Sequence, residues 1–332
     1  MSSHTHFNRQ TSRQHWLANH FGHRNFSIEP ASADASFRSY FRVKSNERSF
    51  ILMDAPPDQE DCRPFIAVQK MLHKHHVNVP EIYAQDIDNG FLLLSDLGST
   101  LYLDVLNEHN ALSLYQKAID SLLLLQSTPQ TPPLPKYTQQ LLTTEMCLFD
   151  EWFIGEHLGH ELDEKQRRIL KQTRQWILGY VLEQPQVMVH RDYHSRNLMM
   201  TELNSPGIID FQDAVHGPFS YDLVSLIKDC YISWSDDLIS ALCDYFITRY
   251  NQIHHNTITL PQFMHWFHLT TAQRHLKTIG IFCRLNYRDG KKNYLNDIPR
   301  TLQYLYQVAA KYPELYEFNQ LLQQLQPKIQ TS

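Results

Sequence analysis

The chain has 332 residues, 42% of them hydrophobic, which is enough to bury a large core and to form two lobes or domains. Its formal net charge of −5 argues against a nucleic-acid-binding surface. Its five cysteines lack zinc or C-x-x-C spacing, its N-terminal 25 residues lack the apolar core of a signal peptide, and its aliphatic runs are too short to span a bilayer. We therefore expect a cytoplasmic protein with reduced thiols and no membrane insertion.

The first hundred residues predict a helix followed by an antiparallel sheet. Alternating apolar and polar residues indicate strands, and a helical apolar pattern lies between the third and fourth of them. The expected elements are a helix near 12–21, strands at 26–30, 37–43 and 49–53, a helix over 61–75, and a hairpin of 81–85 and 91–94. From residue 99 onward helical periodicity dominates, so a small sheet lobe precedes a mostly helical one.

Two motifs in the second half carry chemistry. The segment from His190 to Asn197 reads H-R-D-Y-H-S-R-N, and Asp210 follows the apolar run G-I-I after a predicted hairpin. This order and spacing are typical of phosphotransferases, which need a carboxylate to accept the nucleophile's proton and oxygen ligands for Mg²⁺ on the phosphates. We assign Asp192 as the base, and Asn197 and Asp210 as the metal ligands.

The residues around these motifs narrow the class of enzyme. His190 is interpreted as a packed structural histidine and Arg191 as a residue that orients the loop, because the base role is already filled. A protein kinase would have glycine in place of Gln212 and then a long activation segment. Here a short turn is expected before a helix that Ser220 caps, which favours a small-molecule kinase.

The chain resembles the aminoglycoside phosphotransferase-like kinases, and among them the bacterial anomeric amino-sugar kinases, which phosphorylate N-acetylmuramate and N-acetylglucosamine at C1. The segments that carry the resemblance are 34–42, 51–57, 190–197, 210–223, 273–277 and 287–290. The resemblance implies an α+β, protein-kinase-like bilobal fold, with a small antiparallel-sheet N-lobe over 1–97 and a mostly helical C-lobe over 98–332. It also implies ATP and Mg²⁺ as cofactors, an amino sugar as substrate and a role in cell-wall sugar recycling.

The same resemblance implies where the nucleotide binds. The phosphates would lie under the loop 31–36, at Ser32, Ala33 and Ser36, although this loop has no glycine to ease a close backbone approach. The adenine would lie at Ser95 and Leu97. A simple strand end is an equally good reading of those two residues.

One expected cation is missing. The third strand of such kinases carries a lysine that pairs with a helix glutamate, but Met53 stands near its place, and the next helix offers only Gln69 or Glu60. The lysine and its glutamate partner are expected to be lost together, because either one left alone would be an unpaired buried charge, which is costly. Another cation must then neutralise the phosphates.

Three arginines compete for this role. Arg38 and Arg42 are expected on one face of the second strand together with Tyr40, and Arg196 lies inside the catalytic loop. We favour Arg38, since it lies nearer the phosphate-covering loop. Arg42 is alternatively a surface charge, and Arg196 is alternatively part of an ion pair that shapes the loop.

A cationic stripe is predicted on a helix over 262–285. Three of its residues follow helical spacing, and Arg288 would extend the stripe if the helix continued: Arg274, Lys277 and Arg284. The stripe could bind an anionic acceptor, such as the lactyl carboxylate of N-acetylmuramate. It could equally be a solvated face or make structural pairs with Asp222 and Asp229.

Two other functions remain open at this point. A kinase for an amino alcohol or aminoglycoside would need an acidic pocket, which Asp150, Glu151 and Glu156 could supply. A non-catalytic nucleotide-binding module would explain the missing lysine. The retained base and metal ligands argue against that module, because a scaffold needs no base.

Overall fold

The structure is a computed structural model that describes residues 2–33 and 37–329. The chain divides into two compact units, the first made of residues 1–100 and 199–213 and the second of residues 101–198 and 214–332. The predicted division between residues 97 and 98 stays a prediction. In the described ranges no helix is both long and apolar enough to cross a membrane.

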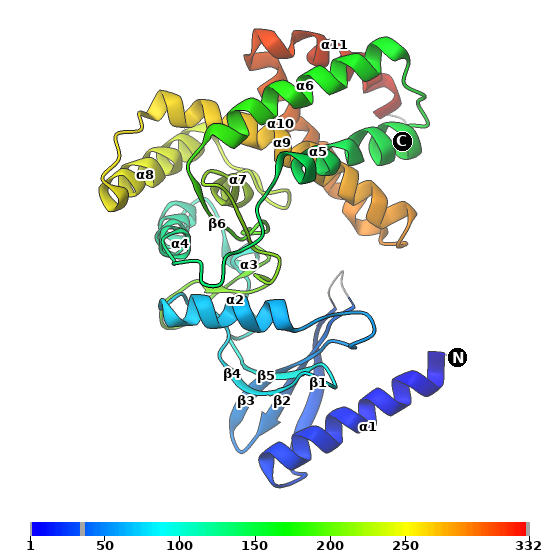
Figure 1. Cartoon of the computed structure of the whole chain (residues 1–332), viewed down its shortest axis with the longest axis vertical. Helices are drawn as coiled ribbons and strands as arrows, with labels where there is room; N and C mark the ends of the chain where they lie inside the picture. Colours follow the sequence, from blue (N-terminus) through cyan, green and yellow to red (C-terminus); the bar gives the residue numbers. More distant parts are fainter. Residues whose placement is uncertain (1, 34–36, 330–332) are drawn as a thin grey trace. The chain divides into compact units, whose positions relative to one another are not determined.

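The first unit is built on a five-stranded antiparallel sheet with strand order β1-β2-β3-β5-β4 (Figure 1). Its elements are α1 (Ser2–Phe21), β1 (Ser27–Ala33), β2 (Ser39–Ser45), β3 (Arg48–Asp54), α2 (Arg63–Lys74), β4 (Ile82–Asp86) and β5 (Phe91–Ser95). The sheet and the helix between its third and fourth strands confirm the alternation read from the sequence.

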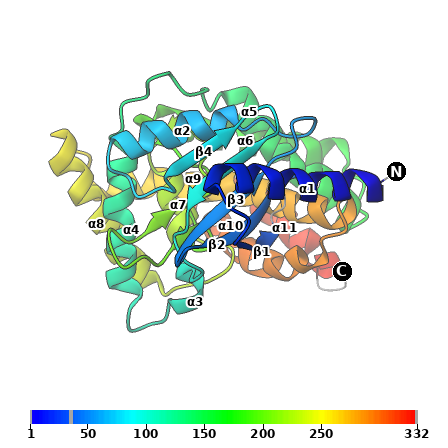
Figure 2. The same cartoon turned by 90° about the horizontal axis from the view of Figure 1, so that it is seen from below.

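Side-chain alternation puts apolar residues on both faces of the sheet centre. Phe50, Leu52 and Leu93 form one buried cluster with Leu17 of α1, which crosses this face (Figure 2). Met53 and its neighbours on the other face are also buried. Helix α1 begins ten residues earlier than predicted, because nothing between residues 2 and 12 is a glycine or proline that would end it.

The segment 199–213 completes the first unit. It carries the short pair β7 (Leu198–Met199) and β8 (Gly207–Ile208). The Asn78 amide donates to the Thr201 hydroxyl and the Asn204 carbonyl, at 3.2 and 2.9 Å. Phe211 packs on Phe65 of α2, with ring centroids 4.7 Å apart. Residues far apart in sequence therefore share one small core.

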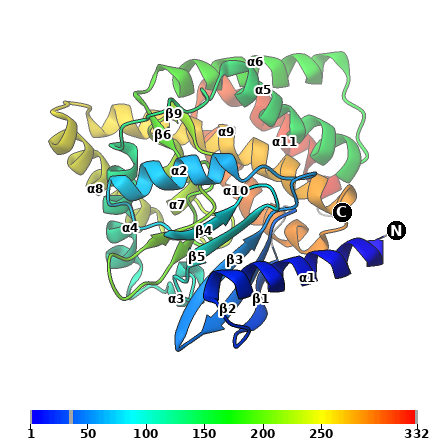
Figure 3. The same ribbon diagram turned by 60° about the horizontal axis from the view of Figure 1, so that its bottom comes forward.

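The second unit is mainly helical, with a two-stranded sheet of β6 and β9. Its elements are α3 (Tyr102–Val105), α4 (Ala111–Gln126), α5 (Gln139–Leu148), η1 (Phe149–His157), α6 (Glu164–Glu183), β6 (Gln186–Val189), β9 (Val215–Pro218), α7 (Tyr221–Ile227), α8 (Asp236–His254), α9 (Leu260–Tyr287), η2 (Lys292–Asp297), α10 (Ile298–Lys311), η3 (Pro313–Leu315) and α11 (Tyr316–Ile329). Helix α9 packs against α5, α6, α7, α8 and α10 and is buried along most of its length (Figure 3).

Two local expectations near residue 220 are wrong. The segment after Asp210 contains a strand, β9, which pairs antiparallel with β6. Ser220 occupies the N-cap position of α7 but makes no side-chain cap. Its fully buried hydroxyl instead donates to the Gln184 side-chain oxygen at 2.6 Å, because a buried hydroxyl needs a partner and Gln184 offers one.

Helix α5 continues without a break into the π-helix η1, which the sequence did not predict. At this junction α9 approaches very closely, since a Cβ added to Gly280 would lie 2.3 Å from the Leu148 carbonyl carbon. Glycine is therefore required at residue 280 by packing, and α5, η1 and α9 form one tightly packed set.

Candidate active site

In the second unit, two buried carboxylates anchor the loop that carries Asp192. Asp222 accepts the backbone N–H groups of His190 and Arg191, at 2.7 and 3.0 Å. Asp229 accepts both the N–H and the hydroxyl of Ser195, at 3.0 and 2.5 Å. Four hydrogen bonds to buried carboxyl groups therefore hold the loop in place. Asp222 therefore supports the loop through the backbone.

Asp192 lies in this loop with its side chain 44% exposed. In the part of the chain that the structure describes, its carboxylate accepts no hydrogen bond, and its nearest charged partner is an Arg274 nitrogen at 4.0 Å. Burial opposes its ionisation, but Lys277, Arg274 and His194 outweigh this and lower the pKa of Asp192 below its usual range. The predicted base is therefore ionised and accessible.

Asn197 closes the loop five residues later. Its side-chain amide donates to the Asp192 backbone carbonyl at 2.9 Å. The bond holds the Asn197 side chain in a fixed place next to the predicted base.

The cationic stripe on α9 is neither solvated nor continuous. Arg274 and Lys277 are buried, whereas Arg284 is half-buried and Arg288 lies beyond the helix end, paired with Asp289. The alternative of a solvated face is wrong for Arg274 and Lys277, because α9 is the central helix of its unit. Contact of these cations with the acceptor stays a prediction.

The buried cations have protein partners that the sequence did not identify. Arg274 donates to the Ser225 hydroxyl at 2.6 Å, and Lys277 lies 3.4 Å from the Glu145 carboxylate. The pairs with Asp222 and Asp229 that were considered as an alternative are absent as ion pairs within 4.0 Å among the residues in the described ranges. Glu145 could have been noticed because it lies on the apolar face of α5, between Leu142 and Met146.

Arg196 occupies a different environment. It is exposed, and its guanidinium lies 3.6 Å over the ring of Tyr231, in the segment between α7 and α8. Among the residues that the structure describes, it makes this cation–π contact and no ion pair within 4.0 Å, so the alternative of an ion pair is wrong.

Of the three acidic residues that could form a pocket for a cationic acceptor, one is neutralised by an arginine. Asp150, in η1, pairs with Arg174 of α6 at 2.7 Å. Glu151 and Glu156 are exposed. One of the three carboxylates is therefore already satisfied by the protein, which weakens the case for an acidic acceptor pocket.

In the first unit, Arg38 lies just before β2 and pairs with Glu60 at 3.1 Å, with the two side chains 9% and 17% exposed. Burial alone would lower the pKa of Arg38, but the charges of Tyr40, Glu60, Asp213 and Asp210 raise it. Gln69 is excluded as the partner, since its buried amide donates to the Pro80 carbonyl. The unit in which the usual Lys–Glu pair is missing therefore contains an Arg–Glu pair with little solvent exposure.

Asp210 adopts a left-handed backbone conformation, with φ of 63°. Non-glycine residues in this region are strained and concentrate at functional sites. One of its carboxylate oxygens accepts from the Gln212 amide at 2.8 Å. The turn therefore holds this carboxylate in a defined orientation close to the charge of Arg38.

No group of three or more His, Cys, Asp or Glu side chains in residues 2–33 and 37–329 could hold a metal by itself. Mg²⁺ does not require such a group, because it is usually bound by one or two protein oxygens together with substrate phosphates and water. The amide oxygen of Asn197 and the carboxylate of Asp210 are ligands of the right kind.

The residues predicted to contact the nucleotide make structural contacts as well. The Ser95 hydroxyl accepts the Glu81 N–H at 2.9 Å, and the Leu97 side chain packs over Gly207. Ser32 and Ala33 end β1 and pair with Tyr40 and Ser39 of β2. Ser36 lies outside the described residues.

Arg42 is not the simple surface charge considered above. It pairs with Asp96 at 2.7 Å and donates to the Gly98 carbonyl at 2.9 Å. Asp96 also accepts from the Ser49 hydroxyl, so these groups tie β2 and β3 to the segment that follows β5.

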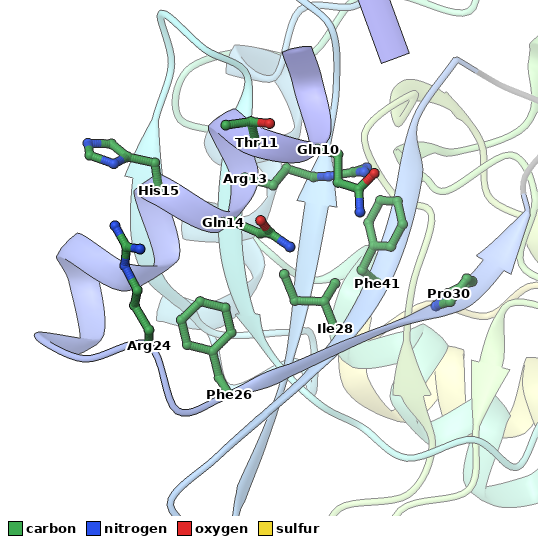
Figure 4. A pocket seen from close by; sticks show the side chains of 10 residues that line it. All are labelled: Gln10, Thr11, Arg13, Gln14, His15, Arg24, Phe26, Ile28, Pro30 and Phe41. Atoms are coloured by element: carbon green, nitrogen blue, oxygen red, sulfur yellow. The ribbon is translucent and has the colours of Figure 1, made fainter. Parts of the chain in front are cut away.

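A pocket of about 650 Å³ lies between α1 and the strands β1 and β2 (Figure 4). It is lined by Gln10, Thr11, Arg13, Gln14, His15, Arg24, Phe26, Ile28, Pro30 and Phe41. None of the predicted site residues lines it. Arg13, one of the cations that line it, is paired with Asp54 and lies over the Phe41 ring. The pocket is therefore not part of the predicted site.

Comparison with known proteins gives a match to a family and matches to individual relatives. The model of the phosphotransferase enzyme family (APH) matches residues 27–255. An N-acetylmuramate/N-acetylglucosamine kinase from Pseudomonas putida is 45% identical over 90% of this chain and 88% of its own length. The protein of the same name from Neisseria meningitidis is 42% identical over 96% of both chains.

Solved structures with low sequence identity share the fold. The choline kinase from Streptococcus pneumoniae superposes with a TM-score of 0.64 at 10% identity, over 92% of this chain and all of that one. Wild-type aminoglycoside 2'-phosphotransferase-IIIa gives 0.59 at 13% identity, over 91% of this chain and 98% of its own. These likenesses confirm the expected protein-kinase-like α+β fold.

Proposed function

Because the chain belongs to the phosphotransferase enzyme family, we propose that it transfers the γ-phosphate of ATP to the anomeric C1 hydroxyl of N-acetylmuramate and N-acetylglucosamine. The observation that carries the choice of acceptor is the 42 to 46% identity, over most of the chain, to relatives that are named as kinases of these sugars. The product would enter cell-wall sugar recycling.

The environment of Asp192 supports this acceptor. A hemiacetal hydroxyl is more acidic than an ordinary alcohol. Transfer of its proton to the Asp192 carboxylate, whose pKa is lowered by Lys277 and Arg274 against the effect of burial, is therefore less unfavourable from C1 than from another carbon. The same two cations favour the negative charge that develops on the attacking oxygen.

The proposed transfer is a single displacement. The C1 hydroxyl gives its proton to Asp192 while its oxygen bonds to the γ-phosphorus. The bond from that phosphorus to the bridging oxygen breaks, and ADP leaves with the electron pair. Positioning and charge neutralisation supply most of the rate in such transfers.

Asn197 and Asp210 are proposed as the protein ligands of Mg²⁺, which when bound would neutralise charge on the phosphates. Arg38, held by Glu60, is proposed as the cation that replaces the missing lysine, and Arg196 is the competing choice. Ser32, Ala33, Ser36, Ser95 and Leu97 are proposed nucleotide contacts, and Arg274, Lys277 and Arg284 are proposed acceptor-side residues. We also propose a cytoplasmic location, since all five cysteines are free.

A panel of acceptors incubated with ATP and followed by phosphorus NMR tests the proposal. N-Acetylmuramate and N-acetylglucosamine should give a C1 phosphate signal that disappears when Mg²⁺ is chelated. Their 1-O-methyl glycosides, which lack only the anomeric hydroxyl, should give none. Choline or an aminoglycoside as the preferred acceptor, or phosphate on another carbon, would overturn it.

A further inference from the structure

A buried cluster of charges lies behind Asp192 in the second unit. The Glu145 carboxylate, 9% exposed, is 2.5 Å from an Arg191 nitrogen and 3.4 Å from the Lys277 ammonium. Its other oxygen accepts the Tyr137 hydroxyl at 2.5 Å. One carboxylate thus binds two cations and a phenol that come from the loop after β6, from α9 and from the segment before α5.

Glu145 and Asp192 differ in how many of the neighbouring cations they bind. Arg191, Arg274 and Lys277 all act on the charge of Asp192, yet only Arg274 comes within 4.0 Å of its carboxylate, and it makes no hydrogen bond to it. Arg274 donates to Ser225 instead, while Glu145 holds Arg191 and Lys277. The predicted base therefore stays accessible although it is surrounded by positive charge.

We propose that Glu145 is a positioning residue that holds Lys277 and Arg191 away from Asp192, so that the carboxylate of the base stays open to the acceptor hydroxyl. This inference rests on the proposed function of Asp192. The physical reason is that a buried ammonium without a counter-ion pairs with the nearest carboxylate, because a buried unpaired charge is costly. Without Glu145, that carboxylate is Asp192.

Glu145→Gln is the direct test, because glutamine keeps the shape and the hydrogen-bonding oxygen but removes the charge. We expect kcat to fall about 10- to 100-fold, within the range that a positioned base contributes, with little change in the KM for ATP. Glu145→Asp should retain more activity than Glu145→Gln. Glu161→Gln makes the same chemical change at an exposed residue of the same unit and should leave kcat unchanged.

The double variant Glu145→Gln, Lys277→Met separates positioning from a merely structural role. If Glu145 acts through Lys277, the change Glu145→Gln should lower kcat less than about threefold in the Lys277→Met background, as expected for coupled neighbours. A structural role predicts that Glu145→Gln lowers kcat as much in that background as in the wild type, and this result would overturn the inference. A contribution of Lys277 to acceptor binding lowers the activity of both members of this comparison alike.

The crystal structure of the Glu145→Gln variant provides a readout that does not depend on activity. The Lys277 ammonium should move to within 4 Å of the Asp192 carboxylate, a distance typical of ion pairs. Lys277 in its original place would overturn the inference even if the wild type proved inactive on amino sugars. Wild-type activity, in turn, reports on the proposed function alone.

Discussion

The carboxylate of Asp192 is accessible and is surrounded by positively charged side chains. Its carboxylate accepts no hydrogen bond from the residues described in the structure, while Asp222 and Asp229 hold its loop through four hydrogen bonds from the loop's N–H groups and the Ser195 hydroxyl. The rigid loop and the open carboxylate together suit a group that must take one proton from a bound hydroxyl.

Replacing Asp192 with asparagine should lower kcat about 10² to 10⁴-fold, because the change removes the proton acceptor and keeps the shape. Steady-state kinetics should show the loss, and a thermal-shift titration should show unchanged ATP binding. Turnover within a factor of about three of the wild type would remove Asp192 from the role of base.

The pH dependence of kcat should also reflect this environment. Burial opposes the ionisation of Asp192, but Lys277 and Arg274 hold its pKa below the usual range, so the base form persists as the pH falls. At saturating ATP and acceptor, we expect no acidic limb from this group between about pH 8 and about pH 5. Measuring nucleotide binding over the same pH range separates the effect of ATP protonation from the effect of protonating the protein. Burial raises the pKa of Asp222, which holds the loop, to about 7, so a limb near pH 7 belongs to loop support. A protein-derived limb with a midpoint between about pH 5 and about pH 6 would contradict the assignment of Asp192.

At the scale of elements, two close approaches shape the chemistry. The start of β2 and the segment before α2 bring Arg38 to Glu60 in the first unit. In the second unit, Gly280 lets α9 pack directly on the end of α5, the two helices that carry Lys277 and Glu145. Backbone placement thus decides which charges can meet.

Arg38→Ala should lower kcat/KM for ATP about 10² to 10³-fold, as does the loss of one donor to a developing charge. Arg42→Ala should cost less than about tenfold, because Arg42 is committed to Asp96 and Gly98. Arg196→Ala provides the comparison. Near-normal rates in the Arg38 variant and collapse in the Arg196 variant would move the role to the catalytic loop.

Gly280→Ala should lower the free energy of unfolding by about 1 to 3 kcal/mol, because the new methyl group would overlap the Leu148 backbone. Gly179→Ala is the matched control, since Gly179 lies in α6 with open space around it. That change should be neutral or should stabilise by up to about 1 kcal/mol. Denaturant unfolding compares the two variants, and equal stability would show that α9 can shift without cost.

At the scale of the whole molecule, the chain order and the compact units do not coincide. Residues 199–213 belong to the first unit although they follow the catalytic loop in sequence. They contribute Phe211 to the core beside Phe65, and they bind the side chain and the backbone of Asn78.

A fragment of residues 1–97 should therefore fold poorly, because it lacks these contacts. A fragment in which residues 1–100 are joined through a flexible linker to residues 199–213 should show a more cooperative and higher thermal transition. Circular dichroism melting of the two fragments measures the difference. Equal melting temperatures would indicate that the segment 199–213 does not stabilise the first unit.

The sequence by itself determined the features that depend on local order. Alternation predicted the five strands of the first unit, and helical periodicity predicted α2 and α9, because these patterns repeat over a few neighbouring residues. The spacing of Asp192, Asn197 and Asp210 indicated phosphotransfer because the three lie within 19 residues of one another along the chain.

Only the tertiary structure decided which distant groups meet. Glu145 lies 46 residues from Arg191 in sequence, and Lys277 is farther still, so no local pattern could pair them. The same holds for Arg38 with Glu60 and for β6 with β9. Burial of α9 decided between the two readings left open for Arg274 and Lys277, which lie inside the unit. The charge of a side chain can be read from the sequence, but its partner depends on the packing of the whole unit.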